Sequence, residues 1–208
     1  MQALRLQTDT TTMKHIASIF TALALCISAA CAGDIEDGDA AYEKKDFATA
    51  LRKFKTAAAQ GLARAQFNLG VMHSVGQGVV QDYAEAVRWY KMAAAQGDAA
   101  AQLNLGFNYS KGQGVVQDYA EAVRWYKLAA AQGDSDAQFN LGFMYGNGQG
   151  VVQDYIRAHL WFNLASVNGD ASAVKNRGII ATKMTSQQIA EAQKLARECQ
   201  ARNFKNCD

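Results

Sequence analysis

A repeat of 36 residues is the feature that most constrains what this chain can fold into. The stretch 101–136 recurs at 65–100 and, with more substitutions, at 137–172, and residues 76–91 and 112–127 share the identical sequence GQGVVQDYAEAVRWYK. Its anchors are Gly61, Gly97, Gly133 and Gly169; Gly70, Gly106 and Gly142; and Trp89, Trp125 and Trp161. A fixed period of this size is typical of a solenoid, in which each supersecondary unit stacks on the next.

Each repeat predicts two helices joined by a glycine-containing loop. The first helix of the first copy is expected from about 65 to 74, with one apolar face made of Ala65, Leu69, Met72 and His73. Gly76 and Gly78 permit a loop with positive φ, Asp82 is placed to cap the second helix, and Gly97 is placed to end it. Gly70 lies inside the first helix, where glycine is unfavourable, so we expect a neighbouring helix to pack closely there.

The charge balance argues against a nucleic-acid partner. The chain carries 21 Lys and Arg against 19 Asp and Glu, which gives no electrostatic case for binding nucleic acid or an acidic membrane surface. Proline is absent, as suits an all-helical chain.

The first 32 residues have the pattern of a secretory signal peptide. Lys14 precedes an apolar run from Ile16 to Ala29, and Ala30-Cys31-Ala32 fits the small-x-small cleavage rule before Gly33. The run is short for a transmembrane helix, and we expect translation to start at Met13. Residues 28–31 also resemble a bacterial lipobox, which would instead place a lipid anchor on Cys31. Either interpretation predicts a periplasmic or secreted protein whose mature chain has no transmembrane span.

Cleavage would leave Cys199 and Cys207 in the mature chain, and we expect them to pair in an oxidising compartment. Eight positions along a straight helix span about 12 Å, which is too far for a disulfide. The chain is therefore expected to turn back after about Asn203. No second pair of Cys or His stands at the spacing of a metal site, so we expect neither a metal nor a cofactor.

The repeat resembles the Sel1-like repeat, a relative of the tetratricopeptide repeat. The resemblance rests on the pattern A-Q-x-N-L-G-x-x-Y-x-x-G-x-G-V-x-x-D-Y-x-x-A-x-x-W-Y-x-x-A-A-x-x-G and covers roughly 36–180. It implies an all-α, right-handed superhelical solenoid of antiparallel helix pairs that serves as an adaptor or scaffold. A cysteine-rich secreted subset is described as penicillin-binding with weak β-lactamase activity, but the three repeats here contain no cysteine.

These features predict six segments and a choice of functions. The segments are a signal peptide at 1–32, a partial repeat at 33–61, full repeats at 62–97, 98–133 and 134–169, and a terminal half-repeat with a capping helix and cysteine-containing tail at 170–208. The leading hypothesis is a non-catalytic scaffold that binds a protein or peptide on its concave face. The alternatives are a weak penicillin-binding protein or β-lactamase and a structural element of an envelope complex.

No combination of residues predicts a catalytic centre, although the question of enzyme activity stays open. Ser172 and Lys175 fit the S-x-x-K signature of serine β-lactamases, but neither S-D-N nor K-T-G follows. His73 and His159 occupy positions that hold Tyr or Val in other repeats, which indicates packing roles. No set of residues in the sequence suggests a catalytic triad.

The first helix of each repeat carries a second apolar face, which gives the candidate binding residues. A peptide or partner segment would contact Phe67, Leu103, Phe107, Phe139 and Phe143, while Asn68, Asn104 and Asn140 would hold its backbone. Burial between neighbouring helices would explain the same pattern, as would use of the Asn side chains to brace adjacent repeats. We expect Phe107 and Phe143 to matter most, because equivalent positions on adjacent repeats would present neighbouring rings.

Overall fold

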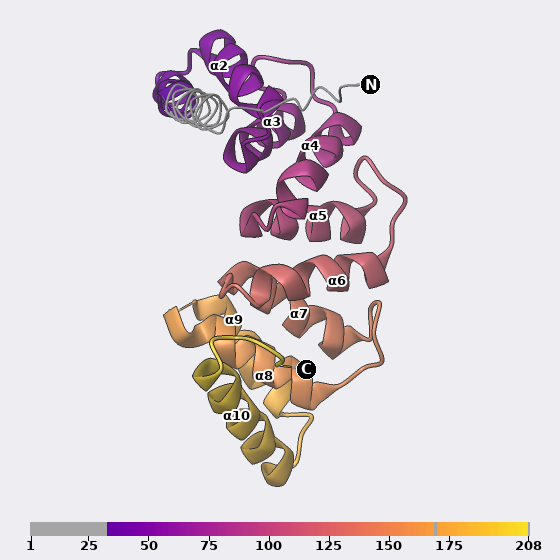
Figure 1. Ribbon diagram of the computed structural model, residues 1–208. Helices are drawn as coiled ribbons and strands as arrows, with labels where there is room; N and C mark the ends of the chain where they lie inside the picture. Colours follow the sequence, from indigo (N-terminus) through magenta and orange to yellow (C-terminus); the bar gives the residue numbers. More distant parts are fainter. Residues whose placement is uncertain (1–32, 169, 208) are drawn as a thin grey trace, which may run out of the picture. The chain divides into compact units, whose positions relative to one another are not determined.

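The computed structural model describes residues 33–168 and 170–207, which form helices joined by turns and loops without any β-strand (Figure 1). The predicted signal peptide and the possible lipid anchor on Cys31 lie outside the described residues. The described residues divide into two compact units, one ending at Gly61 and the other beginning at Leu62. No helix in the described part of the chain has the length and apolar character needed to cross a membrane.

The first unit contains a helical hairpin. A helix over residues 33–43 precedes α2 (Phe47–Ala59), which Asp46 caps through Thr49. The ring of Phe54 lies over Gly38, where a Cβ would come 2.5 Å from the ring. Lys53 Nζ pairs with Asp34 at 2.8 Å and Asp37 at 2.7 Å, which ties the two helices together.

The second unit is a series of antiparallel helix pairs. Its elements are α3 (Ala63–Val75), α4 (Tyr83–Ala95), α5 (Ala99–Lys111), α6 (Tyr119–Ala130), α7 (Ser135–Asn147), α8 (Tyr155–Ala165), the 3-10 turn η1 (Ser166–Asn168), α9 (Ala171–Ala181) and α10 (Ser186–Ala201). α3 pairs with α4, α5 with α6, and α7 with α8, and each second helix also packs on the first helix of the next pair. The expected all-α solenoid of helix pairs is confirmed.

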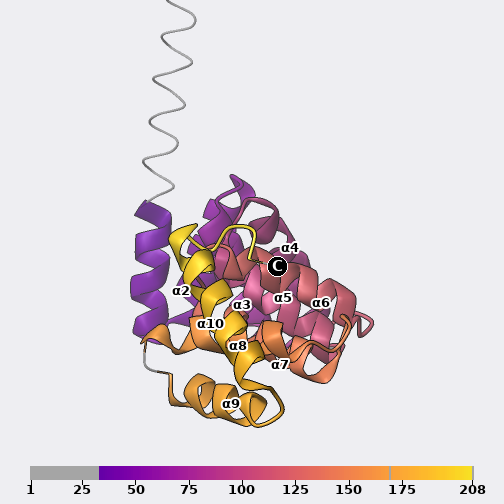
Figure 2. The same cartoon turned by 90° about the horizontal axis from the view of Figure 1, so that it is seen from below.

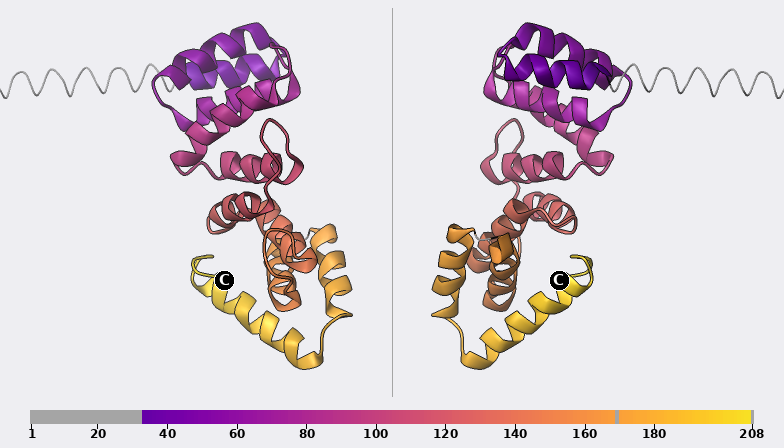
Figure 3. Two further views of the ribbon diagram at one scale, coloured as in Figure 1. Left: turned by 90° about the vertical axis from the view of Figure 1, so that its right-hand side faces the viewer. Right: turned by 90° about the vertical axis from the view of Figure 1, so that its left-hand side faces the viewer.

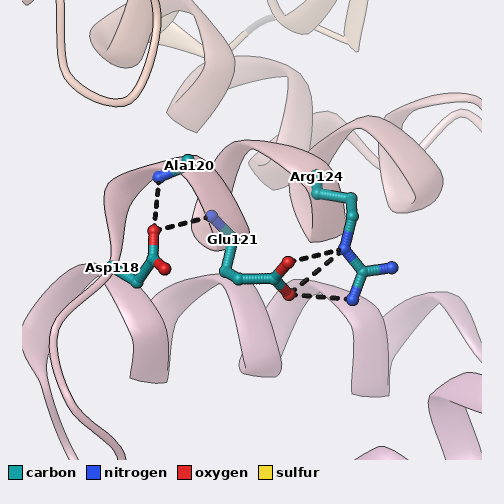
Figure 4. A network of polar contacts seen from close by, with 4 residues as sticks. All are labelled: Asp118, Ala120, Glu121 and Arg124. Carbon is teal, nitrogen blue, oxygen red and sulfur yellow. Dashed lines mark hydrogen bonds and ion pairs between the residues drawn. The ribbon is translucent and has the colours of Figure 1, made fainter.

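Aspartate side chains begin the helices as the sequence predicts. Asp82 and Asp98 accept hydrogen bonds from the backbone of Glu85 and Ala101. Asp118 accepts from Ala120 and Glu121, and the Glu121 carboxylate then pairs with Arg124 at 2.8 Å (Figure 4). The hydrogen bonds to the aspartate side chains satisfy backbone N–H groups that have no partner inside the helix.

Glycines inside the first helices allow the close packing that their positions predict. A Cβ at Gly70 or Gly106 would lie 2.5 Å from the ring of Tyr90 or Tyr126 in the paired helix. Gly142 lies under Phe162 in the same way. Only a residue without a side chain leaves room for these rings, and their burial forms the centre of each repeat.

The glycine loops connect one repeat to the one before it. Gly114, at φ +71°, lies against the backbone of Tyr83 and Ala84, where α4 begins, so a Cβ there would overlap the Tyr83 carbonyl. Gly150, also at φ +71°, lies against Tyr119 and Ala120 in the same way. Positive φ and close backbone contact both require glycine at these two positions.

The last helix does not continue the pairing pattern. α10 begins with a capping box of Thr185 and Gln188, yet it packs along α8 and makes no more than marginal contact with α9. Figure 2 shows α10 over α8 with α9 apart from it, and Figure 3 shows α9 and α10 diverging from the loop that joins them. Ala192, Ala196 and Cys199 are its buried residues, so its apolar face covers α8.

A disulfide between Cys199 and Cys207 fixes the tail that follows α10. The chain reverses at Asn203 and Phe204, which both have positive φ, and this agrees with the turn expected after about Asn203. Phe204 lies over Gly133, where a Cβ would meet its ring at 3.2 Å. The tail thereby reaches the corner between α6 and α7.

Candidate functional site

A row of exposed apolar side chains follows the first helices of the second unit. Phe107 on α5, Phe143 on α7 and Ile179 on α9 are 44%, 38% and 47% exposed. They stand 36 residues apart, so the repeat places them at equivalent positions on successive helices. Side chains of this size are usually buried, and the repeat leaves one of them exposed on each of three successive first helices.

A first pocket of about 300 Å³ lies between α5 and α7. Phe107 forms one wall and Phe143 the other, with Phe139, Asn140 and Tyr126 also lining the space. Four of these five residues belong to the binding face predicted from the sequence.

A second pocket of about 150 Å³ repeats this arrangement between α7 and α9. Phe143, Phe162, Asn176 and Ile179 line it, and each corresponds, 36 residues earlier, to a residue lining the first pocket. Phe143 lines both pockets, so the two pockets adjoin one another, and together they are called the groove below.

Two of the aligned asparagines turn their amide groups toward their own helices. Asn104 Nδ2 donates to the Ala100 carbonyl at 2.8 Å, and Asn176 Nδ2 donates to the Ser172 carbonyl at 2.8 Å. Such a bond fixes the side chain and orients its carbonyl oxygen as an acceptor. Asn140 lines the first pocket and Asn68 is half-buried.

The predicted aromatic and aliphatic residues fall into two groups. Phe67 and Phe139 are half-buried and contact the rings of Tyr90 and Phe162, with centroids 5.9 and 5.5 Å apart, and Leu103 is half-buried against the core. Phe107 and Phe143 are the exposed members. The three half-buried residues therefore contribute mainly to helix packing.

Asn176 and Ile179 belong to the groove, although the sequence prediction omitted both. Asn176 corresponds to Asn140 and Ile179 to Phe143 at the same 36-residue spacing. That spacing was the available signal, because it continues into the terminal half-repeat.

The electrostatic character of the groove is basic. Lys111 lines the first pocket, with its Nζ 5.8 Å from the centre of the Phe107 ring, and Lys183 lines the second. Among the described residues lining either pocket, none is Asp or Glu. A ligand with apolar side chains and a negative charge would match these walls.

The residues considered for catalysis do not gather in a site. Ser172 and Lys175 are both exposed on α9. His159 is buried on α8, and its burial, together with the charge of Arg177, lowers its pKa. No cluster of three or more His, Cys, Asp or Glu side chains placed to hold a metal occurs within residues 33–168 and 170–207.

Comparisons with known proteins identify the repeat. The Sel1 repeat model matches residues 63–98, 99–134 and 135–170. No curated protein matches the chain. The crystal structure of c5321, a protective antigen of uropathogenic Escherichia coli with an SLR fold, matches 82% of this chain at 35% identity with a TM-score of 0.73.

This chain covers 38% of c5321, so it corresponds to less than half of that protein. The Sel1 repeat protein from Oxalobacter formigenes matches 81% of this chain at 30% identity with a TM-score of 0.66, and 74% of its own length is covered. Three consecutive family matches and two solved structures agree with the helix pairs described above. The chain belongs to the Sel1 repeat family.

Proposed function

We propose that this protein is a scaffold that binds an extended segment of a partner protein in the groove over α5, α7 and α9. Sel1 repeat proteins generally mediate protein–protein interaction. The observation that carries the proposal is the pair of equivalent pockets sharing Phe143. An extended chain presents side chains at regular intervals, so two equivalent compartments suit successive apolar anchors.

The groove has the composition of an interaction surface. Aligned, exposed apolar side chains on a folded domain commonly mark a binding site, and aromatic anchors commonly supply much of the interface energy. Phe107 and Phe143 provide rings, while Asn140 and Asn176 provide polar groups at equivalent points of the two compartments. The ligand backbone would bind these amides.

The test is a peptide-display selection against the whole chain, followed by affinity measurements on the selected peptides. Phe143→Ser should weaken binding by about tenfold or more, the usual loss when a central anchor is removed. Val116→Ser is the matched control, because Val116 is 89% exposed and lies outside both pockets. If the peptides bind wild type and Phe143→Ser equally well, the groove is not their binding site.

The site of action is proposed to be the periplasm or the secreted space. The Cys199–Cys207 disulfide supports this location, since disulfides persist in oxidising compartments. N-terminal sequencing of exported protein should return Gly-Asp-Ile-Glu, the sequence that starts at Gly33. Recovery of the protein in the cytoplasm with residues 13–32 retained would contradict the proposal, and acylation of Cys31 would favour a lipid anchor.

A further inference from the structure

The helix α9 lacks the cover that the equivalent helices share. In α3, α5 and α7 an aromatic ring of the paired helix fills the space over Gly70, Gly106 and Gly142. The equivalent residue of α9 is Gly178, where a Cβ would meet no described neighbouring atom within 4 Å. Helix α9 therefore keeps the glycine that makes room for an aromatic ring, but no ring fills the space over it.

A second position on the same helices shows the same difference. Gln66, Gln102 and Gln138 are 2%, 5% and 2% exposed, whereas the equivalent Val174 is 45% exposed. In the first two repeats the covering contact comes from the end of the paired second helix: Gln96 and Gln132 donate to Gln66 and Gln102 at 2.8 and 2.9 Å. The uncovered side of α9 is therefore the side on which a second helix lies in the other repeats.

The chain's own last helix does not supply this cover. α10 packs along α8, and the buried Cys199 ties its end to the tail through the disulfide. Its sequence, SQQIAEAQKLARECQA, has no aromatic residue that could fill the space over Gly178.

The substitutions in α9 indicate the charge of a matching partner. Lys175 stands where Phe67, Leu103 and Phe139 stand in the other repeats, and Arg177 stands where they have leucine. Arg177 is held by Asn163 Oδ1 at 2.5 Å and Ser166 Oγ at 3.1 Å, while Lys175 is exposed. With Lys183, the segment 171–183 carries three basic residues and no acidic residue.

We propose that α9 is an acceptor for a helix from another protein, one that is amphipathic and acidic and carries an aromatic residue. The three internal pairs define its contact face: an aromatic ring over the glycine, followed by alanine three positions later, as in Tyr126 and Ala129 of α6. Carboxylates beside that ring would meet Lys175. This site borders the groove, since the equivalent Gly142 lines the second pocket, but Gly178 and Lys175 line neither pocket. The proposal does not depend on the proposed function of the groove.

The probe is a synthetic peptide of residues 118–133, blocked at both ends and held helical by a staple across its outward positions, because isolated helices of this length are marginal. Arg124→Glu and Lys127→Glu within the peptide make it acidic, and the unsubstituted peptide serves as its charge control. Fluorescence anisotropy with the full chain should show saturable binding that is stronger for the acidic peptide. Tyr126→Ala in the peptide should weaken binding by about tenfold.

Gly178→Leu in the protein should also weaken binding by about tenfold, because the side chain would occupy the place of the ring. Its fold is expected to persist, since the added atoms meet open space, and a melting curve checks this. Lys175→Glu should reverse the preference between the two peptides. Ser172→Leu is the matched control on an exposed position of α9, and Phe143→Ser, which disrupts the groove, should leave peptide binding unchanged.

Three results would overturn the proposal. The first is equal binding of the acidic peptide to wild type and Gly178→Leu. The second is the absence of saturable binding at millimolar peptide. The third is a dimer in sedimentation experiments that Gly178→Leu dissociates, because a second copy of the chain would then be the natural cover of α9.

Discussion

Tyr126 occupies the space that a side chain at Gly106 would need. A Cβ on Gly106 would lie 2.5 Å from both Cδ1 and Cε1 of the Tyr126 ring, closer than real Cβ contacts allow. Tyr126 is itself 1% exposed, so the ring has little freedom to move away. The same glycine position in α9 has no such neighbour among the described residues.

The two glycines should therefore respond to alanine with opposite signs. Gly106→Ala should lower the free energy of unfolding by about 1–3 kcal/mol through overpacking. Gly178→Ala should raise it by about 0.5–1 kcal/mol, since alanine favours the helix. Urea denaturation of the two variants provides the measurement, and a loss of stability in Gly178→Ala would show that its surroundings are closed.

The phenylalanines of the groove should differ in their contribution to stability. Phe162 is 2% exposed and lies against Gly142, so Phe162→Ala should cost about 3–5 kcal/mol. Phe107 is 44% exposed, and Phe107→Ala should cost less than about 1.5 kcal/mol because less apolar area is lost. Equal losses in chemical denaturation would mean that Phe107 is a core residue and would contradict its role as a ligand contact.

Stability should fall in mild acid because of His159. Burial, and then the charge of Arg177, lower the pKa of His159 in the folded chain, while the unfolded chain keeps an ordinary pKa of about 6.5. Below that value the unfolded state takes up a proton that the folded state resists, so folding weakens as the pH drops. His159→Val restores the residue type found at 87 and 123 and should flatten stability between neutral pH and pH ~5. If the stability of His159→Val falls with decreasing pH as steeply as that of wild type, other groups cause the acid sensitivity.

The disulfide should stabilise the end of the array. Cys199→Ser with Cys207→Ser opens a loop closed by residues eight positions apart, which should cost about 2–3 kcal/mol in the chain-entropy account. Thermal unfolding of the variant and of wild type with and without reductant gives the comparison. Two free thiols in denatured, unreduced wild type would show that the bond does not form.

The Asp118 cap should contribute more to the stability of the fold than the ion pair beside it. Asp118→Ala removes the acceptor of two backbone N–H groups (Figure 4) and should cost about 1 kcal/mol. Glu121→Gln removes an exposed pair with Arg124, which is generally worth less than about 1 kcal/mol. Thermal melts should rank the two variants in that order, and the reverse ranking would contradict the assignment.

Local features of the fold were predictable because short stretches of sequence determine them. The Asp82 cap, the glycine turns and the Thr185 capping box follow from neighbouring residues alone. The position of α10 was not predictable, because its amphipathic pattern shows that one face is covered without showing which helix covers it. The open face of α9 went unpredicted for the same reason.

The groove was predictable in part. Residues 67 and 71, like 103 and 107 or 139 and 143, are one helical turn apart and point in nearly the same direction. Helical periodicity therefore assigns them to one face, although Phe67 and Phe139 are half-buried while Phe107 and Phe143 are exposed. Phe143 is exposed even though its ring contacts Phe162 of the paired helix, as the ring of Phe139 does. The exposure of each ring depends on how the neighbouring helices cover it, and helical periodicity alone does not specify that cover.

The contact of Gly114 with the backbone at Tyr83 bears on how such a chain can evolve. The contact uses backbone atoms and a glycine that recurs in the next loop as Gly150, so it depends on no side chain that distinguishes one copy from another. Duplicating or deleting one whole 36-residue unit would therefore recreate the same junction without any compensating substitution. An insertion of any other length within a repeat would displace the glycine from that junction. The chain can thus lengthen its groove by whole repeats. The identical sequences of 76–91 and 112–127 are what the duplication of one repeat would produce.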